Sequence, residues 1–476
     1  MYQTFKDKEL LDGTERIEHL TLVAGCFQFE MTSHTGWRSS GVFITLVICI
    51  AIFTDIFLYG LIVPVLPFAL KVRMGLPEDD IQLWASAFLA IYGGSIFLGS
   101  LLFGWIGDHT KTRKVPFLLG LIVVGGSTLL TALTTSLPLF LLARVLQGLS
   151  TSSVFTIGYC LLLDTVGSEH IGSALGFTSM SLSLGLFAGP IIGGFIYDIA
   201  GYVAVFAPAF ALIIIEIILC GLLQPLPPGY KQHPSFEHHQ SCEESPLLPH
   251  PPEQGQSSPP ALLILLRSPR FLIAMIGMCM LNTFMTALEA VLPIFLQDLF
   301  HYTSSQIAIV FLSNSLPLMI LSPLAGYCVD QLGPFWPAIL GFVLTAPSLM
   351  LLGLIQQNTI LSSVLLRLFL VWFGCGVSLA MPALMTEISM ATEAVEKHHP
   401  GVFGARGAYS QAYGLSNAAF AAGTLAGPLY AGYIREWAGW GAMTVSMGVL
   451  SLVAVGLVVG FTGRRGGWSS CRREDV

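Results

Sequence analysis

The chain alternates between long apolar stretches and short polar ones. A bilayer core of about 30 Å requires about 20 apolar residues in one helix. Stretches of that length are 42–66, 82–106, 115–135, 137–161, 170–197, 202–224, 269–297, 305–328, 334–355, 360–388, 404–433 and 438–461. The pattern therefore predicts an all-α membrane protein with twelve transmembrane helices. Several contain Gly or Pro, which bilayer helices tolerate because their neighbours satisfy the freed backbone groups.

The apolar pattern is interrupted once, between the sixth and seventh stretches. Residues 224–260 are rich in Pro, His, Ser and Glu, and such a segment cannot bury a core. Its histidines lack the spacing of a metal site, so we expect a solvated, disordered linker. The expected organisation is a cytoplasmic tail (1–40), a six-helix bundle (41–224), a cytoplasmic linker (225–268), a second six-helix bundle (269–461) and a cytoplasmic tail (462–476).

Composition agrees with a membrane protein. Hydrophobic residues make up 54 % of the chain and charged residues 10 %, whereas soluble domains carry about 25 % charged residues. The lipid bilayer is therefore the expected solvent. A net charge of −7 gives no sign of nucleic-acid binding. The nine cysteines form no CxxC pair, and we find no phosphate loop or nucleophile elbow, so no metal, cofactor, enzyme activity or ATP-driven pumping is expected.

Basic residues give the bundle an orientation. Lys111, Arg113 and Lys114 follow the second predicted helix, and Arg464 and Arg465 follow the last. With twelve spans these segments lie on the same side as the N-terminal tail. Cytoplasmic loops carry an excess of Lys and Arg, so both termini are expected in the cytoplasm.

The two halves repeat each other. Residues 188–202 read AGPIIGGFIYDIAGY and residues 426–440 read AGPLYAGYIREWAGW, in the fifth and eleventh predicted helices. A second pattern, G-x-x-x-D, follows the second helix and recurs after the eighth as Gly326-x-x-x-Asp330. Parallel six-helix repeats are the layout of many secondary transporters, with the substrate site between the halves near the middle of the membrane.

Motifs in these positions resemble the major facilitator superfamily over residues 41–461. The segment GWIGDHTKTRK resembles the family's signature loop between helices two and three, with Gly104, Asp108, Arg113 and Lys114 at matching positions. The resemblance implies a conformational latch, in which Asp108 and Arg113 hold the cytoplasmic face closed. A simple turn with basic anchors is the alternative.

Two more motifs narrow the resemblance to one branch. RVLQG, which begins at Arg144, resembles a pattern associated with proton coupling. GLFAGPIIGG resembles the motif of drug:proton antiporters at Gly185, Gly189, Pro190, Gly193 and Gly194. The resemblance implies a 12-helix efflux pump like those common in fungi, related to vesicular amine transporters. Small residues also let helices approach closely, so packing alone is the alternative for this motif.

Ionisable residues inside the membrane are costly and usually functional. Asp55 lies midway along the first stretch, in a segment that resembles the first helix of vesicular amine transporters, where an acid faces the central cavity; a helix cap is the alternative. Arg144 lies equally deep, and the two charges are expected to neutralise each other. Glu289 lies well inside the seventh stretch. Glu387, near the end of the tenth, fits a cavity and a membrane edge equally well.

The sequence departs from vesicular amine transporters in the second half. Those proteins carry further acids in helices ten and eleven, where this chain has Val377 and Asn417. The substitution argues against a dedicated monoamine carrier, although Asn417 and Gln411 can hydrogen-bond a polar substrate.

The expected function is proton-coupled export of a small organic molecule by alternating access, with Asp55 exchanging protons. The alternatives are a proton-coupled importer, an amine-type carrier of vesicles or vacuoles, and a receptor without transport activity. The expected partners are the substrate, protons and lipid, and the chain is expected to be a monomer. The plasma membrane is the expected location, with a vacuolar or vesicular membrane as the alternative.

Overall fold

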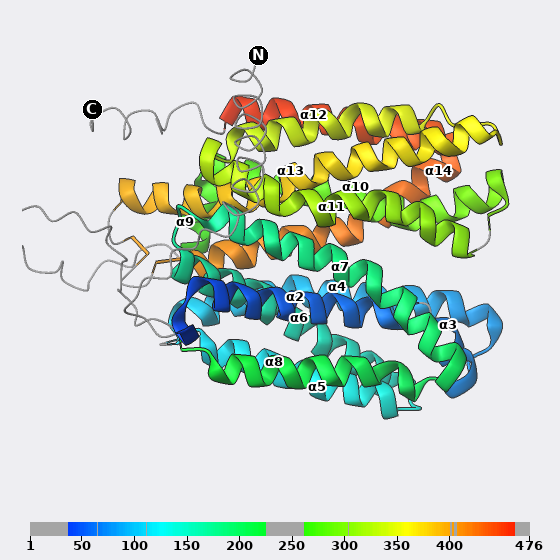
Figure 1. Ribbon diagram of the computed structural model, residues 1–476, viewed down its shortest axis with the longest axis horizontal. Coiled ribbons are helices and arrows are strands. Elements are labelled where there is room, and N and C mark those ends of the chain that lie inside the picture. The colour runs from blue at the N-terminus through cyan, green and yellow to red at the C-terminus, as the bar shows by residue number, and fades with distance from the viewer. Residues whose placement is uncertain are drawn as a thin grey trace, which may run out of the picture.

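A bundle of long helices makes up the computed structural model, which describes residues 37–224 except 64 and 111, and 261–461 except 303, 400–401 and 404–406 (Figure 1). The two tails (1–36 and 462–476) and most of the expected linker (225–260) lie outside the described residues. The elements in chain order are η1 (Trp37–Ser39), α2 (Gly41–Ile62), α3 (Leu66–Phe68), η2 (Ala69–Arg73), α4 (Glu78–His109), α5 (Lys114–Leu133), α6 (Leu137–Val166), α7 (Ile171–Ala200), η3 (Val203–Phe206), α8 (Ala207–Leu222), α9 (Ala261–Arg267), α10 (Pro269–Phe300), α11 (Ser304–Leu332), α12 (Phe335–Leu352), α13 (Ile360–His398) and α14 (Tyr409–Phe461). Within the described residues there is no strand, so the expected all-α class is confirmed.

The predicted twelve spans correspond to eleven long apolar helices, because the last helix holds two spans. α14 is interrupted at Gly439, where φ is 86° and ψ is 174°. A positive φ is open to Gly and strained for other residues, so this glycine ends one span and begins the next. Gly201, at the corresponding position of the repeat, ends α7 with φ 78° and ψ −177°. The repeated sequence therefore folds into the same turn in both halves.

The two halves lie one above the other in Figure 1, with α2 to α8 below and α10 to α14 above. The halves contact each other mainly through α4 with α14 and α7 with α11, and also through α6 with α14 and α7 with α13. α2 begins and α14 ends at the same end of the bundle, on the left in Figure 1, as an even number of spans requires.

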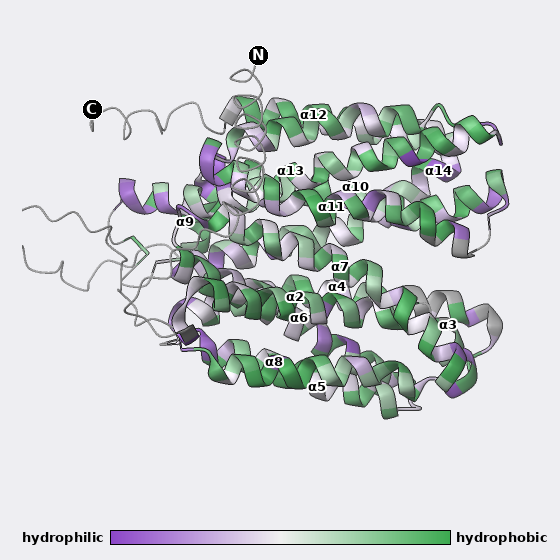
Figure 2. Ribbon diagram, viewed as in Figure 1, coloured by the Kyte–Doolittle hydropathy of each residue, from purple (hydrophilic) through white to green (hydrophobic). Residues whose placement is uncertain are grey.

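Apolar residues cover most of the length of the helices, and polar residues gather mainly at their ends (Figure 2). Many outward-facing side chains are large and apolar, among them Leu98, Phe195 and Leu429, which are 67 %, 67 % and 74 % exposed. An apolar surface of this extent requires lipid rather than water around it. The polar groups that carry chemistry therefore lie inside the bundle.

One boundary differs from the expectation. Residues 261–267, expected to belong to the disordered linker, form the short helix α9. Its Leu265 is fully buried against Phe271 of α10 and Ile388 of α13. The apolar run ALLILL can bury part of its surface against the bundle, so the chain becomes ordered before α10 begins.

Candidate functional site

The small-residue motif of α7 lies directly on the backbone of α2. A Cβ atom at Gly185, Gly189 or Gly193 would lie 2.8, 2.7 or 2.5 Å from a carbonyl oxygen of α2. The ring of Pro190 packs against a glycine of α2, whereas Gly194 has open space around its Cα. Only residues without a side chain permit this approach, and the contact fixes the stretch of α2 that carries the buried acid.

Asp55 is that acid, and it is 3 % exposed. Its Oδ1 accepts a hydrogen bond of 2.9 Å from Thr151 of α6, and the Thr151 hydroxyl lies 3.0 Å from the hydroxyl of Tyr92 of α4. Within the described part of the chain, its Oδ2 has no hydrogen-bond partner. The carboxyl group is thus held in place on one side, with one oxygen free to take a proton or a donor from a ligand.

Arg144 lies in the same cluster and is fully buried. Its Nη1 donates to Oε1 of Gln147 over 2.6 Å, so the first and fourth residues of RVLQG bind each other on one helix face. The guanidinium group lies 4.1 Å from the ring centre of Phe88 and 5.2 Å from that of Tyr92. Nε and Nη2 have no hydrogen-bond partner. Among the described residues no ion pair joins Arg144 to Asp55, although the two charges interact at longer range.

Glu289 approaches this cluster from the other half of the protein. The side chain is half-buried on α10 and interacts electrostatically with Tyr59 of α2. Tyr59 stacks on Tyr92 with ring centres 5.2 Å apart, and the Arg144 guanidinium lies 5.9 Å from the Tyr59 ring. The two tyrosines therefore lie against Arg144, Tyr92 reaches Asp55 through Thr151, and Glu289 interacts with this group only electrostatically.

Sequence reasoning missed Tyr59, Tyr92 and Thr151. The signal for Thr151 was the polar run STSS on an otherwise apolar helix, all of it buried. The tyrosines carried no distinguishing pattern, because membrane helices hold aromatic residues in many positions.

Three of the expected site residues, Glu387, Gln411 and Asn417, lie outside this cluster. Glu387 binds Arg270 through two hydrogen bonds, of which the one from Nη2 to Oε2 is 3.0 Å long. Arg270 is the second residue of α10, beside α9, so this ion pair occupies the end of the bundle and agrees with the membrane-edge alternative. Gln411 uses its backbone N–H to bind Asp108 over 3.0 Å.

A small cavity lies between the halves. Asn417 faces it and also donates to Ser100 of α4 over 2.8 Å. Residues of α6, α10, α13 and α14 line the cavity: Phe155, Tyr159, Met278, Met381, Met385, Ser416, Asn417 and Phe420. Aromatic rings and flexible thioethers adapt to apolar ligands of varied shape.

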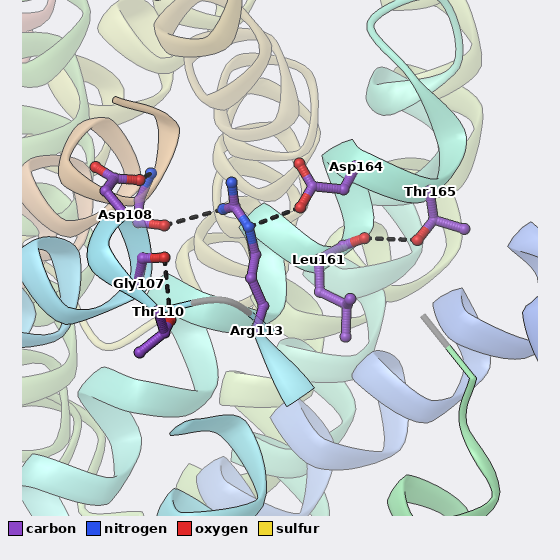
Figure 3. A network of polar contacts seen from close by, with 8 residues as sticks. Gly107, Asp108, Thr110, Arg113, Leu161, Asp164 and Thr165 are labelled. Carbon is purple, nitrogen blue, oxygen red and sulfur yellow. Dashed lines mark hydrogen bonds and ion pairs between the residues drawn. The ribbon is translucent and has the colours of Figure 1, made fainter. Parts of the chain in front are cut away.

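A carboxylate latch joins α4 to the start of α14 near one end of the bundle. Asp108 accepts hydrogen bonds from the backbone N–H groups of Ser410 and Gln411 over 2.9 and 3.0 Å. The N-terminus of a helix has unsatisfied N–H groups and a positive dipole end, which favour a carboxylate. Arg113 strengthens the contact: its Nη1 donates to Ser410 Oγ over 2.9 Å and its Nε binds Asp164 over 2.6 Å (Figure 3).

A second latch repeats this geometry in the other half. Asp330, at the end of α11, accepts from the backbone N–H groups of Gly172 and Ser173 over 2.7 and 2.8 Å. The Ser173 hydroxyl also binds Asp330. These residues belong to the first turn of α7, as Ser410 and Gln411 belong to the start of α14. The two G-x-x-x-D sequences therefore close the same end of the molecule in a symmetric pair.

Comparison with known proteins agrees with this architecture. A family model described as the Major Facilitator Superfamily matches residues 48–407. The MFS-type transporter ppzB of Metarhizium rileyi is 31 % identical over 438 residues, which cover 84 % of this chain and 90 % of that protein. An uncharacterised MFS-type transporter of Schizosaccharomyces pombe is 32 % identical, covering 84 % of this chain and 91 % of the relative.

Two further similarities are more distant. The synaptic vesicular amine transporter of Mus musculus is 25 % identical over 349 residues, covering 71 % of this chain and 59 % of that transporter. The crystal structure of the human organic anion transporter MFSD10 superposes with a TM-score of 0.63 at 16 % identity, over 88 % of this chain and 99 % of the other. The second similarity supports the fold alone.

Proposed function

Because this chain belongs to the major facilitator superfamily and is a multi-pass membrane transporter, we propose that it exports small, largely apolar or cationic organic molecules in exchange for protons. The observation that carries the proposal is the buried acid–base cluster of the first half. Asp55 keeps one unpartnered carboxylate oxygen, and Arg144 keeps two unpartnered nitrogens.

An ionised carboxylate in a low-dielectric interior is costly unless it is paired or neutralised. Asp55 therefore favours either a proton or a ligand cation or donor at its free oxygen. Competition between proton and substrate at one carboxyl group is the simplest basis for exchange. Arg144 belongs to the same cluster but forms no ion pair with Asp55 among the described residues, so the carboxylate stays available to a ligand. In this proposal Glu289 is the acid of the second half that responds to the protonation state of Asp55.

The cavity lining supports an apolar or aromatic substrate. Three methionines and three aromatic residues line it together with Ser416 and Asn417, and the surface that faces the cavity is apolar. The Ser416 hydroxyl is buried and has no hydrogen-bond partner among the described residues.

The two latches support alternating access. Both close the end of the bundle at which α2 begins, and that end is cytoplasmic on the basic-residue criterion. In this proposal the conformation with both latches formed is the one open to the other side. Breaking them lets the halves rock apart and exposes the cavity to the cytoplasm. We propose the plasma membrane as the location and a monomer as the transporting unit.

A vesicular amine-type carrier is the second candidate. It is favoured by the relation to the synaptic vesicular amine transporter and by an acid in the first helix. The second half argues against it, because Val377 is fully buried and Asn417 binds Ser100 where further acids are expected. Transport of a catecholamine would favour this candidate over the exporter.

The test is the variant Asp55→Asn in proteoliposomes with an imposed pH gradient. Ethidium and tetraphenylphosphonium serve as probes because both are lipophilic aromatic cations. We expect wild-type protein to accumulate at least one probe when the lumen is acidic, and Asp55→Asn to lose the gradient-driven component. Glu436→Gln, at an exposed position, is the matched control. Undiminished gradient-driven uptake by Asp55→Asn would refute the coupling role.

A further inference from the structure

Glu216 is a second buried acid in the first half, and the transport cluster described above does not use it. It lies on α8 and is 1 % exposed, so it is more buried than Asp55. Its Oε1 has no hydrogen-bond partner. Among the described residues no ion pair includes Glu216. α8 packs against α2 and α5, on the outer side of α2.

The Glu216 carboxyl is linked to Asp55 through α2. It lies beside the side chain of Thr54, whose hydroxyl donates to the carbonyl oxygen of Ile50, and it interacts electrostatically with Asp55. Thr54 is fully buried and precedes Asp55 directly in the chain. One turn of α2 therefore carries both contacts: Asp55 faces Thr151 of α6, and Thr54 faces α8.

The other titratable groups around Glu216 do not neutralise it. On α8 the neighbour is Cys220, and α5 contributes Lys114 at its first residue. The Lys114 ammonium group is engaged by the carbonyl oxygens of Gly221 and Leu223, at 2.9 and 2.5 Å. Between residues 115 and 133 α5 has no titratable side chain, and η3 has none.

Burying an isolated carboxylate at this depth would cost several kcal/mol of solvation free energy. Among the described residues no neighbouring cation offsets that cost. Two nearby carboxylates in a low-dielectric interior also resist being ionised together. We propose that Glu216 is a second proton-binding site of the transporter, which keeps its proton while Asp55 is ionised. Asp55 and Glu216 together then carry one negative charge at most. Whether Glu216 on α8 is protonated depends on whether a proton or a substrate occupies Asp55. The consequence for transport rests on the proposed function, whereas the protonation state itself does not.

Infrared spectroscopy of the purified, full-length protein tests this without a substrate. The carbonyl-stretch band of protonated carboxylic acids is followed through a pH titration in wild type, Glu216→Gln and Asp55→Asn, with Glu436→Gln as the exposed control. We expect Glu216→Gln to lose one protonated-carboxyl component that wild type retains after Asp55 has ionised. We expect Asp55→Asn to move the titration of the remaining Glu216 component to lower pH, because the neighbouring negative charge is gone. A shift of about one pH unit, a roughly tenfold change in proton affinity, is the scale expected for such a neighbour.

Two results would overturn the proposal. If Glu216→Gln has the spectrum of wild type, Glu216 is ionised in the native protein. If Asp55→Asn leaves the Glu216 titration in place, the two acids are independent. Should Glu216→Gln fail to fold, Thr54→Val removes the neighbouring hydroxyl and keeps the acid, and it must shift the frequency of the Glu216 component. Loss of pH-driven transport in Asp55→Asn tests the proposed function separately, so the two failures are distinguishable.

Discussion

We expect the carboxylate latch at Asp108 to set how often the closed end of the transporter opens, and Asp108→Asn to change this directly. In the native latch the two carboxylate oxygens each accept one backbone N–H from the start of α14, at 2.9 and 3.0 Å. An asparagine keeps one acceptor oxygen, but its amide nitrogen faces the other N–H. One charge-assisted hydrogen bond is lost, and one buried backbone donor is left without a partner.

The magnitude follows from the geometry. A hydrogen bond to a charged group contributes about 1.5–3 kcal/mol, so we take about 2 kcal/mol as the loss. A change of 1.4 kcal/mol is a factor of about 10 in an equilibrium constant, and 2 kcal/mol is therefore roughly 30-fold. Asp108→Asn should raise the population with this end open about 30-fold, with Asp330 still holding the second latch.

Cys160 reports the opening. Its thiol is fully buried on α6 near Arg113, with which it interacts electrostatically. The rate of alkylation by N-ethylmaleimide, measured by mass spectrometry, should rise up to about 30-fold in Asp108→Asn, because exchange through a transient opening follows its population. Cys220, also fully buried but on α8, serves as the internal reference. An unchanged ratio of Cys160 to Cys220 alkylation would refute the reasoning, since it would show that the latch does not restrain this end.

The remaining predictions concern packing and stability. Gly189→Leu should abolish or strongly reduce folded protein, because its Cβ alone would lie 2.7 Å from the carbonyl oxygen of Phe57, whereas Gly194→Leu, with nothing within 4 Å, should be neutral. Size-exclusion yield and melting temperature check this pair, and equal behaviour of the two variants would contradict the packing account. Glu387→Gln should destabilise the second half by about 1–3 kcal/mol, because Arg270 loses a partner in a largely buried pair. Glu393→Gln, which breaks the exposed pair with Lys397, should cost less than about 0.5 kcal/mol in the same thermal melts.

Much of the architecture followed from the pattern of apolar stretches, because a bilayer admits few alternatives. Helices must satisfy their own backbone groups in lipid, so length and hydropathy are enough to locate the spans. The repeat also predicted that Gly201 and Gly439 are equivalent, and both adopt a positive φ. The predicted end of the linker was wrong at α9, because composition alone does not show that a short apolar run packs against the bundle.

The candidate site was less accessible from sequence. Asp55, Arg144 and Glu289 stood out because charge is rare inside a membrane, and their roles in transport stay predictions. The sequence offered no reason to pair Glu387 with Arg270, since the two residues are 117 positions apart. For the same reason the sequence does not show that the backbone N–H of Gln411 binds Asp108, and a substrate contact of the Gln411 side chain stays a prediction.

The sequence by itself determined the number of spans, the two related halves, the family and the small set of buried charges, because each depends on composition, spacing or repetition along one chain. Only the tertiary structure decided what each charge meets. It left Asp55 and Arg144 near each other without an ion pair, turned the two G-x-x-x-D repeats into symmetric latches on helix N-termini, and set Glu216 behind Asp55 across one turn of α2. The physical reason is that the strength of an electrostatic contact depends on distance and burial, and both are fixed when distant helices pack.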